Sequence, residues 1–298
     1  MNSEQLQGLS RSLIFFGIAV VCSVTASVVA GLTGPLFFDQ AIEIAPGGAI
    51  PSSNSDWWQL HLQNFISQAL GFGGAVFIAA AMWQRAVPVG LVATRRSLAP
   101  VGLLLVILAT FFSAPLMAIS YEWNLAAIPE GSVLEAAFKP LEELLEAVTA
   151  FLVTASGPKR IVVILSVALV PAVFEELAFR GALQPLLIKA TGKPWLGIAI
   201  ASVIFSAIHF QFYGFLPRVL LGALFGWLAY RSGSILPGMV AHFVNNAAAA
   251  VTFWSTGSMT EDLFELEAWT VALGAVLTAA TLLAYHRFMP ARQTLSAG

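Results

Sequence analysis

Long apolar runs of about 20 residues recur along the chain, and apolar and polar positions do not alternate within them. This length matches one helix crossing a bilayer, whereas the strands of a membrane barrel would be shorter and alternating. Only helices and closed barrels satisfy their own backbone hydrogen bonds in lipid. The pattern predicts eight membrane spans, at residues 12–36, 62–84, 98–120, 160–180, 194–212, 216–231, 235–255 and 267–287.

A different pattern occupies residues 131–152, between the third and fourth predicted spans. Apolar residues recur at helical spacing from Val133 to Val148, with four glutamates and a lysine on the other side. This pattern predicts an amphipathic helix at the membrane interface. Ser132 followed by Glu135 has the spacing of a capping box and predicts its start. A solvated helix without a special role is the alternative.

Composition supports a membrane protein. Of the 298 residues, 58% are apolar and 10% are charged, whereas soluble domains average about 25% charged residues. We therefore expect an all-α, polytopic membrane protein, a bundle of eight spans plus the interfacial helix. The net charge of −2 argues against nucleic-acid binding. The single cysteine, Cys22, excludes an internal disulfide and is interpreted as a packing residue.

Three regions are expected from the spans. Residues 1–155 hold the first three spans and the amphipathic helix, residues 156–256 hold spans four to seven, and residues 257–298 hold the last span and the C-terminal tail. The first three spans have no charged residue in their interiors, which indicates packing and anchoring elements.

Loop charges predict the orientation. With a cytoplasmic N-terminus, nine basic residues fall inside, namely Arg11, Arg85, Arg95, Arg96, Lys189, Lys193, Arg231, Arg287 and Arg292. Four fall outside, namely Lys139, Lys159, Arg160 and Arg218. The excess follows the positive-inside rule. The acidic segments 130–146 and 261–267 fall outside. We expect a multi-pass protein of the cell's inner or plasma membrane with both termini in the cytoplasm.

Aromatic residues flank several spans. Residues 35–60 contain no Lys or Arg, are rich in Pro and Gly, and end near Trp57 and Trp58. They are predicted to form an external loop that ends in an interfacial aromatic anchor. His61 and His286 lie at span ends and are likewise predicted to be interfacial.

Ionisable residues inside a span cost about 2.5–3.5 kcal/mol each at a helix centre, so they are functional candidates. The fourth span ends in the sequence EELAFR, from Glu175 to Arg180. Glu176 and Arg180 are four residues apart and are predicted to pair on one helix face. Glu175 is rotated by about 100° and remains free for chemistry. A cluster that meets water at the membrane edge is the alternative.

Two further spans contain histidine. In the fifth, His209 follows Phe205 by one helical turn, so the two rings are expected to pack together. In the seventh, His242 and Asn246 lie on one helix face and can present two hydrogen-bond donors. Asn245 lies on a different face and is predicted to hydrogen-bond between helices.

Together these side chains suit hydrolysis by activated water. Glu175 would act as general base, with His209 holding and polarising the water. His242 and Asn246 would stabilise the tetrahedral oxyanion. The sequence contains no GxSxG, HExxH or GxGxxG motif that would indicate another chemistry.

The ordered motifs EExxxR, FxxxH and HxxxN resemble those of the CPBP family, the type II CAAX-prenyl-endopeptidase and bacteriocin-processing intramembrane peptidases, which include abortive-infection-like proteins. The resemblance covers about residues 160–255. It implies an eight-helix bundle that cleaves a peptide bond near a substrate's C-terminus or at a membrane-proximal site. It maps the family's catalytic residues onto Glu175, His209, His242 and Asn246, and the supporting motif positions onto Glu176, Arg180 and Phe205.

Several alternatives remain open at this point. The favoured mechanism requires no cofactor, but Glu175, His209 and His242 also suit a zinc site with an open water position. The expected partners are the bilayer and a membrane-associated peptide or protein, prenylated or not. A membrane carrier is disfavoured because no internal repeat is visible. A non-catalytic scaffold, in which the polar cluster only holds helices together, is the third possibility.

Overall fold

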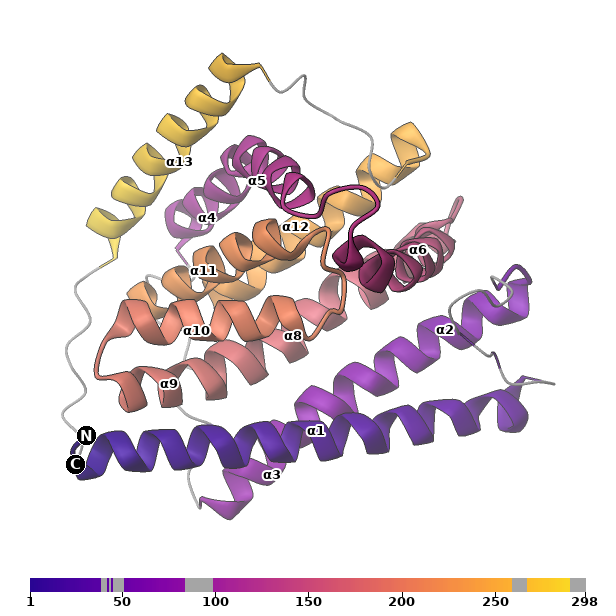
Figure 1. The fold of residues 1–298 in the computed structure, drawn as a ribbon, viewed down its shortest axis with the longest axis horizontal. Coiled ribbons are helices and arrows are strands. Elements are labelled where there is room, and N and C mark those ends of the chain that lie inside the picture. The colour runs from indigo at the N-terminus through magenta and orange to yellow at the C-terminus, as the bar shows by residue number, and fades with distance from the viewer. Residues whose placement is uncertain (39–41, 43, 45–50, 84–98, 259–266, 290–298) are drawn as a thin grey trace.

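The computed structural model describes residues 1–38, 42, 44, 51–83, 99–258 and 267–289, and every regular element in these residues is a helix (Figure 1). The predicted all-α fold is therefore confirmed. The basic residues Arg85, Arg95, Arg96 and Arg292, the acidic segment 261–266, and Pro46, Gly47 and Gly48 of the predicted external loop lie outside the described residues. The orientation across the membrane stays a prediction.

The helices follow in the order α1 (Ser3–Phe37), α2 (Asn54–Ile66), η1 (Ser67–Gly73), α3 (Gly74–Met82), α4 (Pro100–Phe112), α5 (Ala114–Ala126), α6 (Val133–Val153), α7 (Lys159–Val163), η2 (Ile164–Leu169), α8 (Val170–Glu176), η3 (Leu177–Leu183), α9 (Gln184–Thr191), α10 (Pro194–Ala207), α11 (Phe215–Ser232), α12 (Leu236–Thr256) and α13 (Ala268–Phe288). The segments labelled η are wider π-helical turns. Such turns inside α-helices often occur at functional sites.

Five helical stretches in the described residues are long and apolar enough to cross a membrane, namely Ser3–Phe37, Asn54–Met82, Pro100–Ala126, Lys159–Thr191 and Ala268–Phe288. The other three predicted spans correspond to α10, α11 and α12. With 14 residues, α10 is about 21 Å long, shorter than the hydrocarbon core of a bilayer. Polar residues lower the hydropathy of α11 and α12. The polytopic fold agrees with the prediction, while the count of eight stays a prediction.

Two predicted boundaries are wrong for local reasons. The span predicted at 98–120 is interrupted at Ser113 and continues to Ala126. Pro115 has no N–H for the carbonyl four residues earlier, so a regular helix cannot pass through it unchanged. The span predicted at 194–212 ends at Ala207. Phe210 shortly afterwards has a φ of 56°, a left-handed conformation that no right-handed helix contains.

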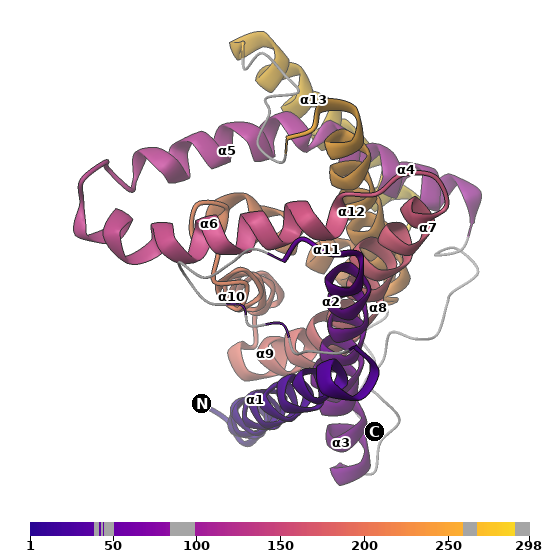
Figure 2. The ribbon, with the colours of Figure 1, turned by 90° about the vertical axis from the view of Figure 1, so that its right-hand side faces the viewer.

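The helices pack around the continuous stretch Lys159–Thr191. On one side it contacts α1, α2 and η1, and on the other it contacts α10 and α12. Beyond these, α11 packs between α10 and α12, and α4, α5 and α13 form the far side of the bundle (Figure 1). Helix α6 lies across one end of the bundle, where it contacts α2, α7 and α12 (Figure 2).

Helix α6 begins and ends within two residues of the predicted amphipathic helix. Ser132 accepts the N–H of Glu135, as expected of an N-cap. The glutamate does not complete the capping box, because its carboxylate accepts the N–H of Gly131 instead. The position of α6 at the membrane interface stays a prediction.

Two residues expected at the membrane interface are buried instead. Trp57 is 3% exposed and donates its Nε1–H to the carbonyl of Leu152, 3.1 Å away. His61 is 4% exposed and bonds to the Ser166 hydroxyl and, at 3.2 Å, to the same carbonyl. The last carbonyls of a helix have no hydrogen-bond partner within that helix. Side chains of α2 therefore provide the partners of a carbonyl at the end of α6. Trp58, which is 41% exposed, fits the predicted anchor.

Cys22 behaves as predicted. It is buried and packs in the apolar cluster that joins α1, α3, η3 and α10.

The close packing of α1 against α9 generates a prediction. A Cβ added to Gly8 would lie 2.5 Å from the backbone nitrogen of Ala190, whereas a Cβ on Gly17 of the same helix meets no atom within 4 Å. We expect Gly8→Ala to push the helices apart and cost about 1–3 kcal/mol. Gly17→Ala should be neutral or slightly stabilising, because Ala is the better helix former. Heat unfolding in detergent measures both, and equal stabilities would contradict this packing.

Candidate active site

The predicted pair between Glu176 and Arg180 is present and fully buried. Arg180 Nη1 lies 2.8 Å from Glu176 Oε1, and the two side chains are 2% and 0% exposed. The second terminal nitrogen, Nη2, donates to the carbonyl of Gly222 at 2.9 Å. The guanidinium also lies 4.7 Å from the centre of the Phe205 ring. A paired and hydrogen-bonded ion pair is the form in which charge is tolerated inside a protein.

Glycine permits this close packing at Gly238 of α12. A Cβ there would lie 2.7 Å from Glu176 Oε2 and 3.3 Å from the carbonyl of Phe225. No side chain larger than hydrogen fits without moving the glutamate.

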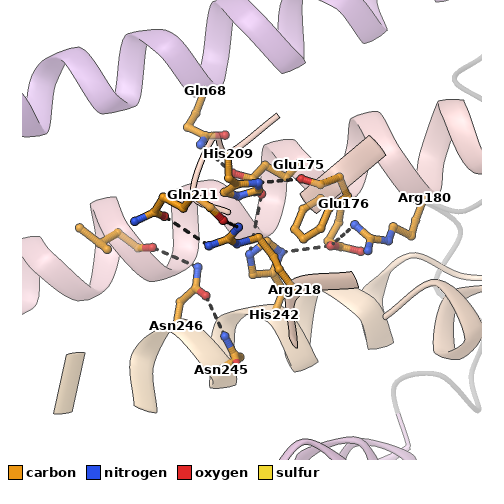
Figure 3. A network of polar contacts seen from close by, with 12 residues as sticks. Gln68, Glu175, Glu176, Arg180, His209, Gln211, Arg218, His242, Asn245 and Asn246 are labelled. Atoms are coloured by element: carbon orange, nitrogen blue, oxygen red, sulfur yellow. Dashed lines mark hydrogen bonds and ion pairs between the residues drawn. The ribbon is translucent and has the colours of Figure 1, made fainter. Parts of the chain in front are cut away.

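Glu175 points away from this pair, as predicted. Its Oε1 accepts a hydrogen bond of 2.8 Å from Gln68 Nε2. Its Oε2 lies 3.9 Å from His209 Nε2 and 3.9 Å from His242 Nε2 (Figure 3). The carboxylate is thus held on one side and faces two imidazoles on the other. In the described part of the chain, Oε2 has no hydrogen-bond donor.

The second nitrogen of each imidazole fixes its tautomer. His209 Nδ1 lies 2.7 Å from the carbonyl of Phe205, and His242 Nδ1 lies 3.1 Å from Glu176 Oε1. Both oxygens act as acceptors, so both Nδ1 atoms must donate. In the neutral rings the Nε2 atoms then carry lone pairs. Three acceptor atoms therefore converge on one space beside Glu175.

Aromatic packing orients the two histidines. The ring of Phe205 lies edge-on to both, with centroids 5.0 Å from His209 and 5.8 Å from His242. Phe225 stacks on His242 at 5.1 Å. The expected packing of Phe205 against His209 is present, and the contact with His242 adds a second role for that ring.

His209 lies on the turn after α10 rather than inside a helix. The neighbouring α5 and α6 hold the end of this turn. Asn124 donates to the carbonyl of Phe212 at 2.7 Å, and Glu142 accepts the N–H of Tyr213 at 3.3 Å. Burial raises the pKa of the Glu142 carboxyl. The Phe138 ring stacks on Phe212 at 4.2 Å. The amphipathic helix α6 therefore helps to position the turn that carries His209.

The interhelical hydrogen bond expected of Asn245 is made by Asn246. Asn246 Nδ2 bonds between helices, donating to the carbonyl of Val167 at 3.3 Å. That carbonyl lies four residues before Pro171, which has no N–H to offer it. Asn245 instead donates to Asn246 Oδ1 at 3.2 Å. The prediction that Asn245 makes the interhelical bond is therefore wrong, and both side chains line the cavity described next.

A cavity of about 480 Å³ opens onto these groups. It is lined by Glu175, His209, His242 and the two asparagines, and also by Arg218 and Gln211. Sequence reasoning counted Arg218 among the external basic residues at the start of the sixth span and gave it no role at the site. It lies in the first turn of α11 with its side chain toward the cavity.

Sequence reasoning also missed Gln68. The first three spans were interpreted as packing elements, which is wrong for the second, since Gln68 of η1 bonds to Glu175. Its signal was present, because Asn64 and Gln68 are polar residues one helical turn apart in an apolar run. Asn64 donates to the carbonyl of Ser166 at 2.7 Å.

Zinc is the alternative occupant of the space between Glu175, His209 and His242. Two imidazoles and one carboxylate, each histidine held through Nδ1, have the chemistry of a catalytic zinc site. The spacing differs, because tetrahedral ligands at zinc bond lengths lie about 3.3 Å apart, against 3.9 Å here. Within the described ranges, no group of three or more His, Cys, Asp or Glu side chains is arranged to hold a metal ion. The donor types therefore fit zinc, while the spacing is wider than that of zinc ligands.

The fold and the site define an α-helical membrane protein with a buried carboxylate–histidine centre, the class of the intramembrane hydrolases. Residues 157–248 match the family model of the Rce1-like type II CAAX prenyl endopeptidases. This match supports a CPBP-type intramembrane peptidase domain in that segment of the chain. No curated protein and no solved structure gave a significant match. The matched segment contains all three sequence motifs.

The buried ion pair generates a prediction about stability. Arg180→Met leaves Glu176 charged and buried without its partner, and such a loss costs about 3–5 kcal/mol. We therefore expect a large fall in resistance to heat and to denaturing detergent. Lys139→Met is the matched control, because the Lys139–Glu135 pair has the same spacing but is exposed. Equal losses in the two variants would show that Glu176 does not depend on Arg180.

Proposed function

We propose that this chain is an intramembrane endopeptidase that hydrolyses a peptide bond of a membrane-associated protein or peptide by metal-free activation of water. The observation that carries the proposal is the convergence of Glu175 Oε2 with the Nε2 atoms of His209 and His242, each 3.9 Å away, at one cavity. A water oxygen at ordinary hydrogen-bond distances fits between atoms so spaced.

In the proposed reaction, Glu175 removes a proton from this water, and the hydroxide oxygen attacks the peptide carbonyl carbon. Gln68 holds the other carboxylate oxygen and so fixes the direction from which the base acts. His209 Nε2 accepts a hydrogen bond from the second O–H of the water, which stays intact, and so holds the water in place. When the carbon–nitrogen bond breaks, the proton held by Glu175 passes to the leaving amine.

The oxyanion of the tetrahedral intermediate requires donors, and His242 and Asn246 are proposed for this role. Because His242 Nδ1 donates to Glu176, Nε2 can donate only when the ring is protonated. Glu176 then stabilises the imidazolium from its far side, as a carboxylate does for the histidine of a catalytic triad. Asn246 has a second amide hydrogen beyond the one bonded to Val167.

The alternative is a zinc peptidase in which Glu175, His209 and His242 hold the metal. A bound zinc ion would lower the pKa of its water to about 7 and so supply the nucleophile. On that alternative, Glu176 and the Phe205 carbonyl would orient the two histidine ligands through Nδ1.

The proposed substrate is membrane-associated, because the cavity lies among helices suited to lipid. A prenylated substrate and a role in peptide maturation are proposed on the family resemblance alone. We propose the inner or plasma membrane as the location, with both termini cytoplasmic.

The mechanism predicts a ranking of variants. Glu175→Gln and His209→Ala should abolish cleavage of a membrane-tethered peptide, because they remove the base and the group that holds the water. Asn246→Ala should lower kcat by on the order of 100-fold, the usual loss for one oxyanion donor. Product formation by purified protein in detergent or liposomes measures each variant.

Glu143→Gln is the control for this series, because Glu143 is an exposed carboxylate on α6. It should cleave as the unmodified protein does. Cleavage that persists in Glu175→Gln would eliminate the general base and the proposed mechanism with it.

The metal-free mechanism also predicts the effect of chelators. Cleavage should survive prolonged treatment with EDTA and 1,10-phenanthroline, and metal analysis of active protein should find no stoichiometric zinc. Loss of cleavage that added Zn²⁺ restores would instead establish the zinc alternative.

A further inference from the structure

Among the described residues, Arg218 is a cation at the cavity without a counter-ion. It lines the same cavity as Glu175 and the two histidines. In the described part of the chain it forms no ion pair with a carboxylate. Glu142 and Glu175 attract it from beyond ion-pair distance. One oxygen of each carboxylate is bonded elsewhere, to the Tyr213 N–H and to Gln68 Nε2 respectively. A partly buried charge without a counter-ion is costly.

Its hydrogen bonds leave most of its donors available. Arg218 Nη1 donates to the backbone carbonyl of Gln211 at 3.0 Å, and Nη2 donates to Gln211 Oε1 at 3.3 Å (Figure 3). A guanidinium has five N–H bonds, so three have no partner among the described residues. Both bonds to Gln211 fix the guanidinium while adding no negative charge. The group is therefore positioned but not neutralised.

We propose that Arg218 is a specificity residue that binds a carboxylate of the substrate, an inference that rests on the proposed peptidase function. The planar guanidinium matches a carboxylate with two parallel hydrogen bonds. A peptide has two sources of this group, its C-terminus and the side chains of Asp and Glu. Either one, held by Arg218, would fix the register of the scissile bond at Glu175.

The test compares binding with cleavage. Acylated octapeptide pools, randomised over residues other than Asp and Glu, are prepared with a C-terminal carboxylate, with a C-terminal amide, and as the amide with Glu fixed at the last position. The three pools are mixed in equal amounts and equilibrated with immobilised Glu175→Gln protein in detergent. Mass spectrometry then quantifies the bound peptides.

We expect at least one carboxylate-bearing pool to bind about 10–100-fold more tightly than the plain amide pool, the range for hydrogen bonds to a charged group. Enrichment of the free-acid pool identifies the C-terminus, and enrichment of the Glu pool identifies a side chain. Adding Arg218→Gln should remove the enrichment, while Arg160→Gln, an exposed arginine on α7, should keep it. Equal binding of all pools to protein that retains Arg218 would overturn the inference.

Cleavage by protein with Glu175 intact separates this inference from the proposed function. For the preferred pool, Arg218→Gln should raise KM by a similar factor and leave kcat within a few-fold. Arg218→Lys, which keeps the charge but loses the planar fork, should fall between. Carboxylate-dependent binding without any cleavage would reject the peptidase function and support the role of Arg218. Cleavage that does not depend on a carboxylate would support the peptidase function and reject the role of Arg218.

Discussion

The buried ion pair between Glu176 and Arg180 is the interaction on which the site depends. One Glu176 oxygen accepts hydrogen bonds from both Arg180 and His242, so a single carboxylate joins the ion pair to a histidine of the candidate site. Arg180 continues the connection to α11 through the Gly222 carbonyl. Three helices are thereby fixed relative to one another by groups that cannot be left unpaired in a low-dielectric interior. This rigidity sets the distances around Glu175.

Much of this site could be predicted from the sequence, because the features concerned depend on residues close together in the chain. Membrane spans follow from apolar length, and the Glu176–Arg180 pair follows from four-residue spacing on a helix. The separation of Glu175 from Glu176 follows from helical rotation. The same rules missed Gln68 and Arg218, because the contacts of these side chains depend on how distant helices pack. The bend at Ser113 was readable from Pro115 but was hidden within one long apolar run.

The roles of Asn245 and Asn246 show why local rules fail between neighbours. Both lie on the cavity side of α12, and helical spacing alone does not decide which one reaches another helix. Pro171 of the neighbouring stretch decides it, because it cannot pair with the carbonyl of Val167, and Asn246 Nδ2 supplies a donor. A proline in one helix thus orients an amide in another, a relation visible only once the helices are placed together.

The site contains more hydrogen-bond acceptors than donors in the space beside Glu175, and its chemistry follows from this excess. Glu175 Oε2 and two Nε2 atoms converge as acceptors, while their remaining bonds to Gln68, the Phe205 carbonyl and Glu176 keep them from turning away. Such a space requires an occupant that donates hydrogen bonds or accepts lone pairs. Water meets the first requirement and zinc the second, and both alternatives would use the three atoms around the 3.9 Å contacts. Arg218 presents the opposite imbalance, with donors in excess, on the wall of the same cavity. The proposed peptide substrate carries one group for each of these two sets of atoms. Its carbonyl would be attacked by the activated water, and its carboxylate would bind the guanidinium.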